Sequence, residues 1–173
     1  MNFLILSDSH GRAINIERAY ERSRELDGIF FLGDGLSDFD DLYRYKNTPL
    51  FCVRGNCDLF SSFSFGDVKD ELILHFEEYT VMLMHGHRYG VKDSLSAAIA
   101  HAAKAGADVL LYGHTHVPLE RRIEAGEEYC GVTLKKPLYV FNPGSVGTLS
   151  AGYFSFGTLT VRRNGLLFGH GKL

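Results

Sequence analysis

The chain carries the stretch Phe3-Leu4-Ile5-Leu6-Ser7-Asp8-Ser9-His10, in which a short apolar run ends at two potential metal ligands. An apolar run of this length is typical of a buried strand. Four more clusters of potential ligands each follow an apolar run: Asp34 in Gly-Asp-Gly, Asn56 in Gly-Asn-Cys-Asp, His85 in Met-His-Gly-His, and His114 with His116 in Gly-His-Thr-His. Carboxylate, imidazole and amide donors together suit a pair of borderline divalent ions, so the five clusters predict a two-metal hydrolytic site.

Around this stretch, the first third of the chain alternates strand and helix patterns. Strands are predicted at residues 3–7, 29–32 and 50–53. A helix is predicted over residues 14–26, with Gly28 as its stop, and a second helical segment up to about residue 46. This βαβαβ order predicts a parallel sheet with right-handed crossovers.

The rest of the chain is richer in strand patterns. Strands are predicted at residues 72–76, 80–84, 108–112, 119–124, 138–142, 153–161 and 166–168. A helix that Asp93 or Ser94 can cap lies between the second and third of these strands and ends at Gly106. The turn Arg163-Asn164-Gly165 predicts a hairpin. With 173 residues, 45% of them hydrophobic, and no linker, we expect one domain over residues 1–173.

The composition narrows the class of protein. A formal net charge of -3 without a basic stripe gives no support to duplex nucleic-acid binding. The three cysteines have no framework spacing, which favours a reducing compartment and therefore the cytoplasm. No apolar stretch approaches the roughly 20 residues that span a bilayer, so membrane insertion is not expected. A homo-oligomer is compatible with the sequence but not indicated by it.

The candidate ligands share one position relative to the strands. Asp8, Asp34, Asn56, His85 and His114 each follow a predicted strand within a few residues. Ligands of open α/β sheets bind at the carboxyl ends of the strands, so we expect these side chains to converge on one edge. Glycines beside nearly every ligand fit tight turns that let the backbone approach an ion or a phosphate, although ordinary turns use glycine as well.

At these motifs the chain resembles the calcineurin-like metallophosphoesterases, whose pattern is Asp-x-His, Gly-Asp, Gly-Asn-His-(Asp/Glu), His and Gly-His-x-His. The resemblance covers residues 8–116, and Asn142-Pro143-Gly144-Ser145 is similar to a segment of the small bacterial and archaeal phosphodiesterase branch. It implies an α/β fold, a four-layer αββα sandwich with two mixed β-sheets flanked by helices. By motif position it implies one metal on Asp8, His10 and His116, another on Asn56, His85 and His114, and Asp34 as the bridging carboxylate.

The activity implied is metal-dependent hydrolysis of a small phosphodiester. Two divalent ions about 3.5–4 Å apart can acidify a bridging water, so that hydroxide attacks phosphorus, and can neutralise the charge that builds on the phosphate. The expected catalytic residues are Asp34, Asn56, His85 and His87. The expected substrate contacts are Arg12, Asn56 and His87. Manganese is the expected ion, although iron, nickel, cobalt or zinc suits the same donors.

Two alternatives use the same fold. One is a phosphomonoesterase or phosphoprotein phosphatase on the same site. The other is a non-catalytic, protein-binding scaffold similar to the retromer subunit of this fold, which has lost part of the ligand set. Every ligand position is retained here, which favours the enzyme.

The chain departs from the family pattern at Cys57, where larger members have a histidine that helps protonate the leaving group or steady the phosphate. Because cysteine replaces this histidine, we expect hydrolysis to require a substrate with a good leaving group or another acid, such as His87. A thiol has a pKa of about 8.5 and is a poor acid for an alkoxide, so Cys57 is interpreted as a small buried filler rather than a ligand. Asp58 either anchors the ligand loop through backbone hydrogen bonds or lies exposed.

Other polar and aromatic residues near the motifs have ordinary explanations. Arg12 and Arg54 stand beside ligand motifs, where an arginine can hold a phosphate or a carboxylate, but Arg12 can equally start a helix. Three histidines are expected to be structural or exposed: His75, His101 and His170. Three aspartates are expected to cap a helix: Asp38, Asp40 and Asp41. Three aromatic residues are expected to pack in a core or dimer contact rather than stack on a base: Phe60, Phe63 and Phe65.

Overall fold

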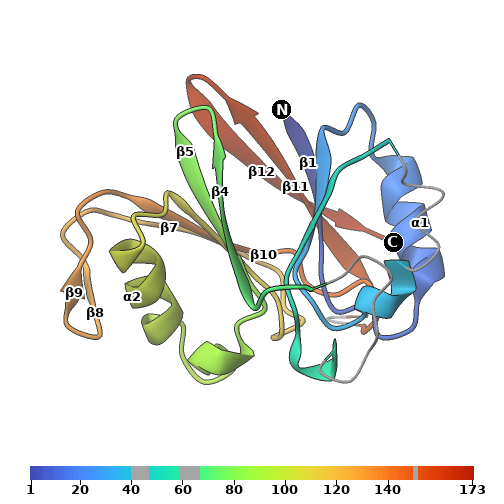
Figure 1. Ribbon diagram of the computed structural model, residues 1–173, viewed down its shortest axis with the longest axis horizontal. Coiled ribbons are helices and arrows are strands. Elements are labelled where there is room, and N and C mark those ends of the chain that lie inside the picture. The colour runs from blue at the N-terminus through green and yellow to red at the C-terminus, as the bar shows by residue number, and fades with distance from the viewer. Residues whose placement is uncertain (40–46, 59–66, 150–151) are drawn as a thin grey trace.

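Two five-stranded β-sheets lie face to face in the described residues, 1–39, 47–58, 67–149 and 152–173, and an α-helix covers the outer face of each sheet (Figure 1). These positions come from a computed structural model of the chain. The layers therefore follow the order helix, sheet, sheet, helix. This confirms the predicted α/β sandwich of two mixed sheets flanked by helices.

The first sheet has the strand order β12-β11-β1-β2-β3. Its strands are β1 (Asn2–Leu6), β2 (Gly28–Phe31), β3 (Leu50–Cys52), β11 (Ser155–Arg162) and β12 (Gly165–Lys172). The three strands from the first third of the chain are parallel, as predicted, whereas β11 runs antiparallel to β1. The predicted hairpin joins β11 to β12, with Arg162 opposite Gly165.

Helix α1 (Ala13–Arg22) connects β1 to β2 and is shorter than predicted. It ends before Gly28 because Ser23 has extended backbone and its hydroxyl donates a hydrogen bond to the carbonyl oxygen of Ala19. The helical segment predicted up to about residue 46 lies largely outside the described residues. In the described part of that connection, the chain forms a 3₁₀ helix, η1 (Leu36–Phe39).

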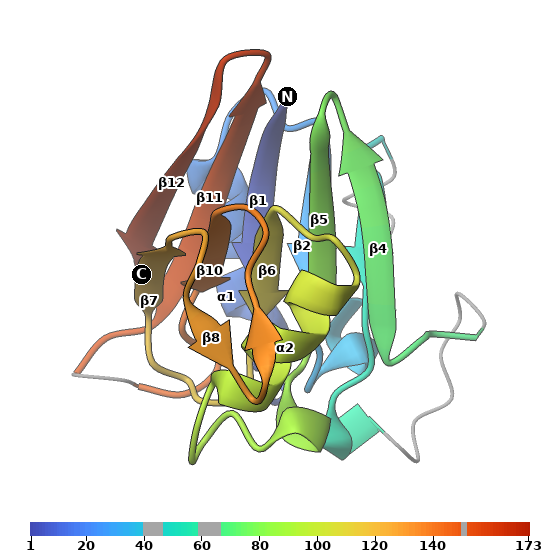
Figure 2. The same cartoon turned by 90° about the vertical axis from the view of Figure 1, so that its left-hand side faces the viewer.

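The second sheet has the strand order β4-β5-β6-β10-β7. Its strands are β4 (Glu71–Phe76), β5 (Tyr79–Met84), β6 (Val109–Tyr112), β7 (Leu119–Ile123) and β10 (Leu138–Asn142). Helix α2 (Ser96–Lys104) covers it, and the small ribbon of β8 (Glu128–Tyr129) and β9 (Val132–Thr133) lies beside α2 (Figure 2). The prediction missed this ribbon because strands of two residues carry no alternating pattern. Ser94 accepts a hydrogen bond from the Ser96 backbone N–H, although Leu95 is the capping position.

Alternating side chains divide the interior into three cores. Phe3 and Ile5 of β1 face the space between the sheets, whereas Leu4 and Leu6 face α1. Met82 of β5 belongs to the third core, beneath α2. Each fully buried side chain of this size contributes about 1.5–3 kcal/mol to the free energy of folding. Because the core strands are packed on both faces, the loops at their ends start from fixed positions.

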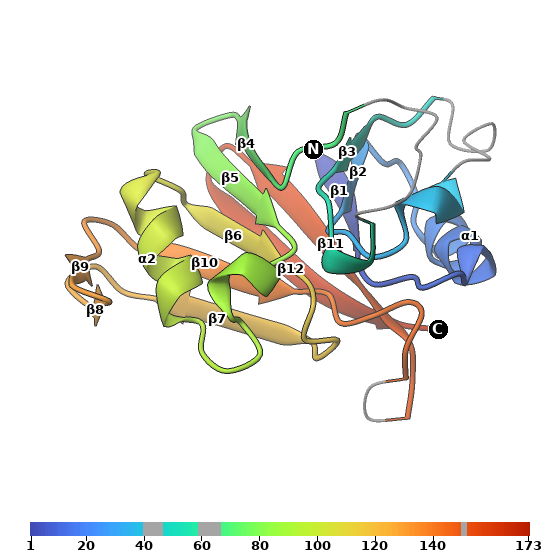
Figure 3. The same cartoon turned by 60° about the horizontal axis from the view of Figure 1, so that its bottom comes forward.

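The carboxyl ends of the parallel strands meet at one edge of the two sheets. Figure 3 turns this edge forward and shows the 3₁₀ helices η3 (Asn56–Asp58) and η4 (His87–Tyr89) beside it. Both follow a strand that was predicted to deliver a metal ligand. Among the described residues, no helix is long and apolar enough to cross a membrane.

Candidate metal centre

Three overlapping groups of potential metal donors lie at this edge. Within each group, one donor atom from each residue lies within 4.8 Å of the others. The groups are Asp8 with His10 and His116, His10 with Asp34 and Cys57, and Asp34 with His85 and His114. His10 and Asp34 each belong to two groups, so the donors form one continuous cluster. The structure thus brings together six of the seven predicted metal ligands.

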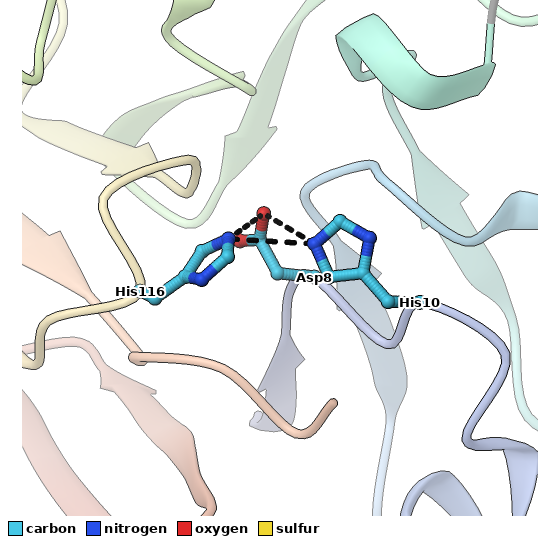
Figure 4. A group of neighbouring side chains, drawn as sticks. All are labelled: Asp8, His10 and His116. Carbon is cyan, nitrogen blue, oxygen red and sulfur yellow. Dashed lines mark hydrogen bonds and ion pairs between the residues drawn. The ribbon is translucent and has the colours of Figure 1, made fainter. Parts of the chain in front are cut away.

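Asp8, His10 and His116 form the more open end of the cluster (Figure 4). The Oδ1 atom of Asp8 lies 3.1 Å from Nε2 of His116 and 3.8 Å from Nε2 of His10. The two Nε2 atoms are 3.4 Å apart. Both imidazole rings therefore direct the same nitrogen at one carboxylate oxygen from opposite sides.

The Asp8 carboxylate is fully buried, and its two oxygens have different surroundings. Oδ2 accepts hydrogen bonds from the Ser7 hydroxyl and from the His114 backbone N–H, the latter at 3.0 Å. Oδ1 has no hydrogen-bond partner among the described residues. A buried carboxylate oxygen without a donor is costly, and a cation bound beside it would remove that cost.

His85, Asp34 and His114 form the buried end of the cluster. The Nδ1–H of His85 donates to the carbonyl oxygen of Leu32 at 2.7 Å, which fixes the ring orientation and leaves Nε2 as the free nitrogen. That Nε2 lies 3.4 Å from Oδ2 of Asp34 and 3.1 Å from Nδ1 of His114. A backbone carbonyl on the far ring nitrogen is a common support for a metal-ligating histidine.

Burial and neighbouring charges shift the pKa values of several side chains in the donor cluster. Burial raises the pKa of the Asp34 carboxyl, but His85 and the Cys57 N–H lower it by more, so its pKa lies well below the usual range. Burial lowers the pKa of His85, but the Asp34 and Asp8 carboxylates reverse this and leave it raised. Burial, with the charges of His85 and Lys92, lowers the pKa of His114 to about 4. His114 is therefore a neutral donor at pH 7.

The ligand loops share an unusual backbone conformation. Among the described residues, eight that are not glycine have a positive φ, and five of these eight are predicted metal ligands. The five are Asp8, His10, Asp34, His114 and His116, with φ between 45° and 65°. This conformation costs about 1–3 kcal/mol per residue and tends to occur at functional sites. The fold therefore sustains strain at the positions where the donors converge.

Asp58 holds two of these loops together. Its buried carboxylate accepts four backbone hydrogen bonds at 2.7–3.0 Å. The donors are the N–H groups of Asp34, Gly35, Leu36 and Gly55. This agrees with the anchoring role that was one of the two predictions for Asp58.

The segment Asn142-Pro143-Gly144-Ser145 supports two other ligand loops. Asn142 Nδ2 donates to the carbonyl oxygen of Gly113 at 3.0 Å, beside His114. The Ser145 hydroxyl donates to the backbone carbonyl oxygen of Asp8 at 2.8 Å. The sequence singled out this segment by resemblance alone, and its contacts support the loops that carry two of the predicted ligands, Asp8 and His114.

Three other predicted site residues lie outside the groups of potential metal donors: Asn56, His87 and Arg12. Asn56 is exposed in η3, and its Nδ2 donates to Sγ of Cys57 at 3.3 Å. The His87 ring centroid lies 5.4 Å from that of His85, and its buried Nδ1 has no hydrogen-bond partner among the described residues. Burial and the charges of His85 and Arg88 lower the pKa of His87. The exposed Arg12 places its guanidinium 5.3 Å from the Phe154 ring centroid, a cation–π contact.

Two interpretations from the sequence are wrong. Cys57 is exposed, not a buried filler, and its sulfur belongs to one of the donor groups. Asp38 does not cap an α-helix: it lies within η1, where its carboxylate accepts hydrogen bonds from the Ser9 hydroxyl and the Gly11 N–H. It therefore braces the loop that carries Asp8 and His10. Residues 40, 41, 60, 63 and 65, on which other predictions fell, lie outside the described residues.

The remaining predicted residues have structural contacts. Arg54 Nη2 donates to the carbonyl oxygen of Val68 at 2.8 Å. His101 pairs with Glu71 at 2.8 Å, and His75 is exposed on β4. His170 stacks on Phe141 with ring centroids 4.4 Å apart. These contacts agree with structural or exposed roles for the three histidines.

Known proteins are similar to this chain in sequence and in fold. A sequence model of the calcineurin-like phosphoesterase superfamily domain matches residues 1–164. YsnB of Bacillus subtilis, a probable metallophosphoesterase, is 35% identical over 147 residues, which are 84% of this chain and 75% of YsnB. The phosphodiesterase YfcE of Escherichia coli is 32% identical over 114 residues, 60% of this chain and 47% of YfcE. A Streptococcus pneumoniae structure described as a predicted phosphoesterase superposes with a TM-score of 0.70 at 20% identity, covering 99% of this chain and 97% of that one.

The two-sheet sandwich with histidine and carboxylate donors at its edge defines a phosphoric ester hydrolase of the metal-binding type. Within that class, the chain belongs to the calcineurin-like phosphoesterase superfamily. The predicted family is thus confirmed. The donors also fit the divalent metals that such an enzyme requires, because Asp8 Oδ1 is buried without a hydrogen-bond donor in the described part of the chain and the bond from His85 Nδ1 to Leu32 leaves Nε2 facing the other donors.

Proposed function

We propose that this protein is a metal-dependent phosphodiesterase with a dinuclear centre. The observation that carries the proposal is the continuous donor cluster, in which Asp34 is shared between a buried group and a more open one. A shared carboxylate between two sets of histidines is an arrangement that can hold two ions. The phosphodiesterase name of the relative YfcE supports the same reaction.

The residues divide between two ions. Asp8, His10 and His116 would hold one, and His85 and His114, with Asn56 from η3, would hold the other, while Asp34 contributes to both. When bound, two divalent ions would make a water molecule acidic enough to attack phosphorus and would offset the negative charge of the phosphate. We propose manganese, although iron, cobalt, nickel or zinc suits the same nitrogen and oxygen donors.

His87 is the residue best placed to contact the substrate. Its ring lies beside His85 and His114, outside the donor groups, and its buried Nδ1 has no hydrogen-bond partner among the described residues. Because its pKa is lowered, the ring is neutral at pH 7 and carries one N–H. That N–H can donate a hydrogen bond to a phosphate oxygen, whereas protonation of a leaving alkoxide would require the imidazolium form of the ring.

Arg12 is the N-cap residue of α1, which agrees with the interpretation that it starts a helix, and its guanidinium lies over the Phe154 ring. Because Arg12 follows His10 by two residues, we place its donors at the rim of the open donor group. It can meet the charged part of a substrate that reaches past the open donor group, but the cluster itself does not depend on it. We propose a substrate contact for Arg12 at this rim.

A diester is favoured over a monoester because of Cys57. A neutral thiol replaces the histidine that would assist an unactivated leaving group, and the pKa of Cys57 is raised to about 11 by burial and by Asp34. Such a thiol gives up its proton less readily than a histidine does. We therefore propose small phosphodiesters with good leaving groups as substrates. The three free cysteines support a reducing compartment.

The test is hydrolysis of an activated aryl phosphodiester and of the matching monoester, each in manganese. A chelated sample and the His85→Ala variant serve as blanks, and His75→Ala, an exposed histidine on β4, is the matched control. We expect diester turnover that disappears in both blanks and persists in the control. A preference for the monoester would make the protein a phosphatase, and full activity of His85→Ala would remove the metal assignment. Inactivity on both esters across several metals would favour the protein-binding scaffold.

A further inference from the structure

Cys57 lies among the donors of the metal centre. Its Sγ, a ring nitrogen of His10 and a carboxylate oxygen of Asp34 all lie within 4.8 Å of one another. We propose that Cys57 is a further ligand of the ion held by His10 and Asp34, so that this position binds thiophilic divalent ions such as zinc more tightly than the manganese proposed for catalysis. The inference deepens the proposed function and rests on it, because it concerns the same metal centre.

The backbone keeps the sulfur at this place. Cys57 is the middle residue of η3, and its N–H donates to Oδ1 of Asp34 at 2.7 Å. The next residue, Asp58, is fixed by its four backbone hydrogen bonds. The thiol therefore stays beside Asp34 unless the whole loop rearranges.

The surroundings of the sulfur suit a ligand. The Asn56 amide nitrogen donates a hydrogen bond to Sγ at 3.3 Å, and a hydrogen bond to a ligand atom helps to orient and stabilise that ligand. Cys57 and His10 are both exposed, so an ion from solvent can reach them directly. On binding, the thiol would release its proton to solvent, and the sulfur would bind as thiolate.

The distances and the chemistry agree with a single ion. In a tetrahedral zinc site, donors about 2.0–2.3 Å from the ion lie roughly 3.3–3.8 Å apart, so the three side chains, whose donor atoms lie within 4.8 Å of one another, would need to move by up to about 1 Å to bind one ion. Thiolate is a soft ligand that selects zinc, whereas carboxylate and imidazole alone also accept manganese. The family histidine at this position would not make that distinction, because an imidazole suits many of the same ions as the rest of the site.

Cobalt(II) reports sulfur ligation directly, because a thiolate bound to cobalt adds a charge-transfer band in the near ultraviolet. Metal-free protein would be titrated with cobalt(II) and its absorption recorded for wild type, Cys57→Ser, Cys57→Ala and Cys130→Ser. Cys130 is an exposed cysteine in the β8–β9 ribbon and is the matched control. We expect the band in wild type and Cys130→Ser and its loss in both Cys57 variants.

Competition dialysis gives a second measurement that is independent of activity. The affinity for zinc relative to manganese should fall by about tenfold or more in Cys57→Ser, which corresponds to about 1.4 kcal/mol, and should be unchanged in Cys130→Ser. A wild-type cobalt complex without the band, or a band that survives in Cys57→Ser, would overturn the assignment of Cys57 as a ligand. The proposed function would still stand if the protein hydrolysed the diester in a metal-dependent way. Failure to bind cobalt together with no turnover in any metal would overturn both.

Discussion

Oδ2 of Asp58 accepts a hydrogen bond from the backbone N–H of Asp34 at 2.7 Å. The same oxygen accepts from Gly55 N–H at 2.8 Å, so one atom joins the loop after β2 to the loop after β3. At this point neither loop is held by hydrogen bonds of a β-sheet. The position of Asp34, the donor shared between the two ends of the cluster, therefore depends on a carboxylate that binds no metal itself.

The substitution Asp58→Asn should weaken metal binding. An amide offers one acceptor oxygen in place of two, and its NH₂ group would face backbone N–H donors. Loss of such a supporting contact typically costs about 10–100-fold in metal affinity, and we expect that range for manganese. Calorimetric titration of the metal-free protein measures it, with Asp93→Asn, an exposed aspartate beyond η4, as the control. An unchanged manganese affinity would show that Asp58 does not position Asp34.

Metal removal should lower the thermal stability of the protein. An ion that binds the folded state alone stabilises it by about 2.7 kcal/mol at a concentration 100 times its Kd. Thermal unfolding in manganese and in chelator would measure the difference in Tm. His85→Ala should show a much smaller difference, whereas His75→Ala should respond like wild type. An equal response in His85→Ala would place the stabilising ion elsewhere.

Substitution of Gly55 by alanine should disrupt the site, because the added Cβ would clash with Asp34. A Cβ there would lie 2.1 Å from Oδ1 and 2.5 Å from the backbone nitrogen of Asp34. Gly126 is the contrast: its Cβ would meet no atom within 4 Å, although its φ of +93° is unfavourable for alanine. We expect Gly55→Ala to lose metal-dependent turnover. Gly126→Ala should lose about 1 kcal/mol of stability and keep its rate.

Denaturant unfolding and initial rates, measured on both glycine variants, separate the two effects. Backbone strain, which only Gly126→Ala would suffer, should lower the free energy of unfolding without affecting catalysis, whereas the clash in Gly55→Ala should also lower the rate. If Gly55→Ala retained full turnover, the loop would have room to move away from Asp34, and the close packing of the two loops would be irrelevant to the chemistry.

The sequence predicts most of this fold because each core strand is a short, continuous apolar run. The run before Asp8 and the run over residues 138–142 stand out from the polar loops around them, and both form strands. The donors were predictable for the same reason: each stands just after such a run. In contrast, α1 ends where Ser23 takes an extended backbone, and no periodic pattern marks that change.

Most of the supporting contacts could not be read from the sequence, because they join residues across long sequence separations; the anchoring role of Asp58 was one of two open predictions. Asp38 has the appearance of a helix cap, yet it braces a loop 27 residues away, at Gly11. The exposure of Cys57 depends on how η3 meets Asp34, which a sequence pattern does not contain. The segment that contains Ser145 was singled out by its resemblance to the phosphodiesterase branch and not by any pattern in the residues themselves.

Replacing Cys57 by histidine should change how the rate depends on the leaving group. A histidine at this position would have a ring next to Asp34 and could protonate the departing alkoxide, which the raised pKa of the thiol, about 11, makes difficult. General acid catalysis contributes up to about 10²–10⁴-fold when a leaving group is poor, and almost nothing when it is good. Rates for a series of aryl and alkyl phosphodiesters should therefore fall steeply with leaving-group pKa in wild type and more gently in Cys57→His.

The series should be run in manganese, so that a change in the bound ion does not contribute, with Cys130→His as the matched control. Parallel slopes in the two proteins would mean that the leaving group is protonated by another residue, and His87 would be the one to substitute next.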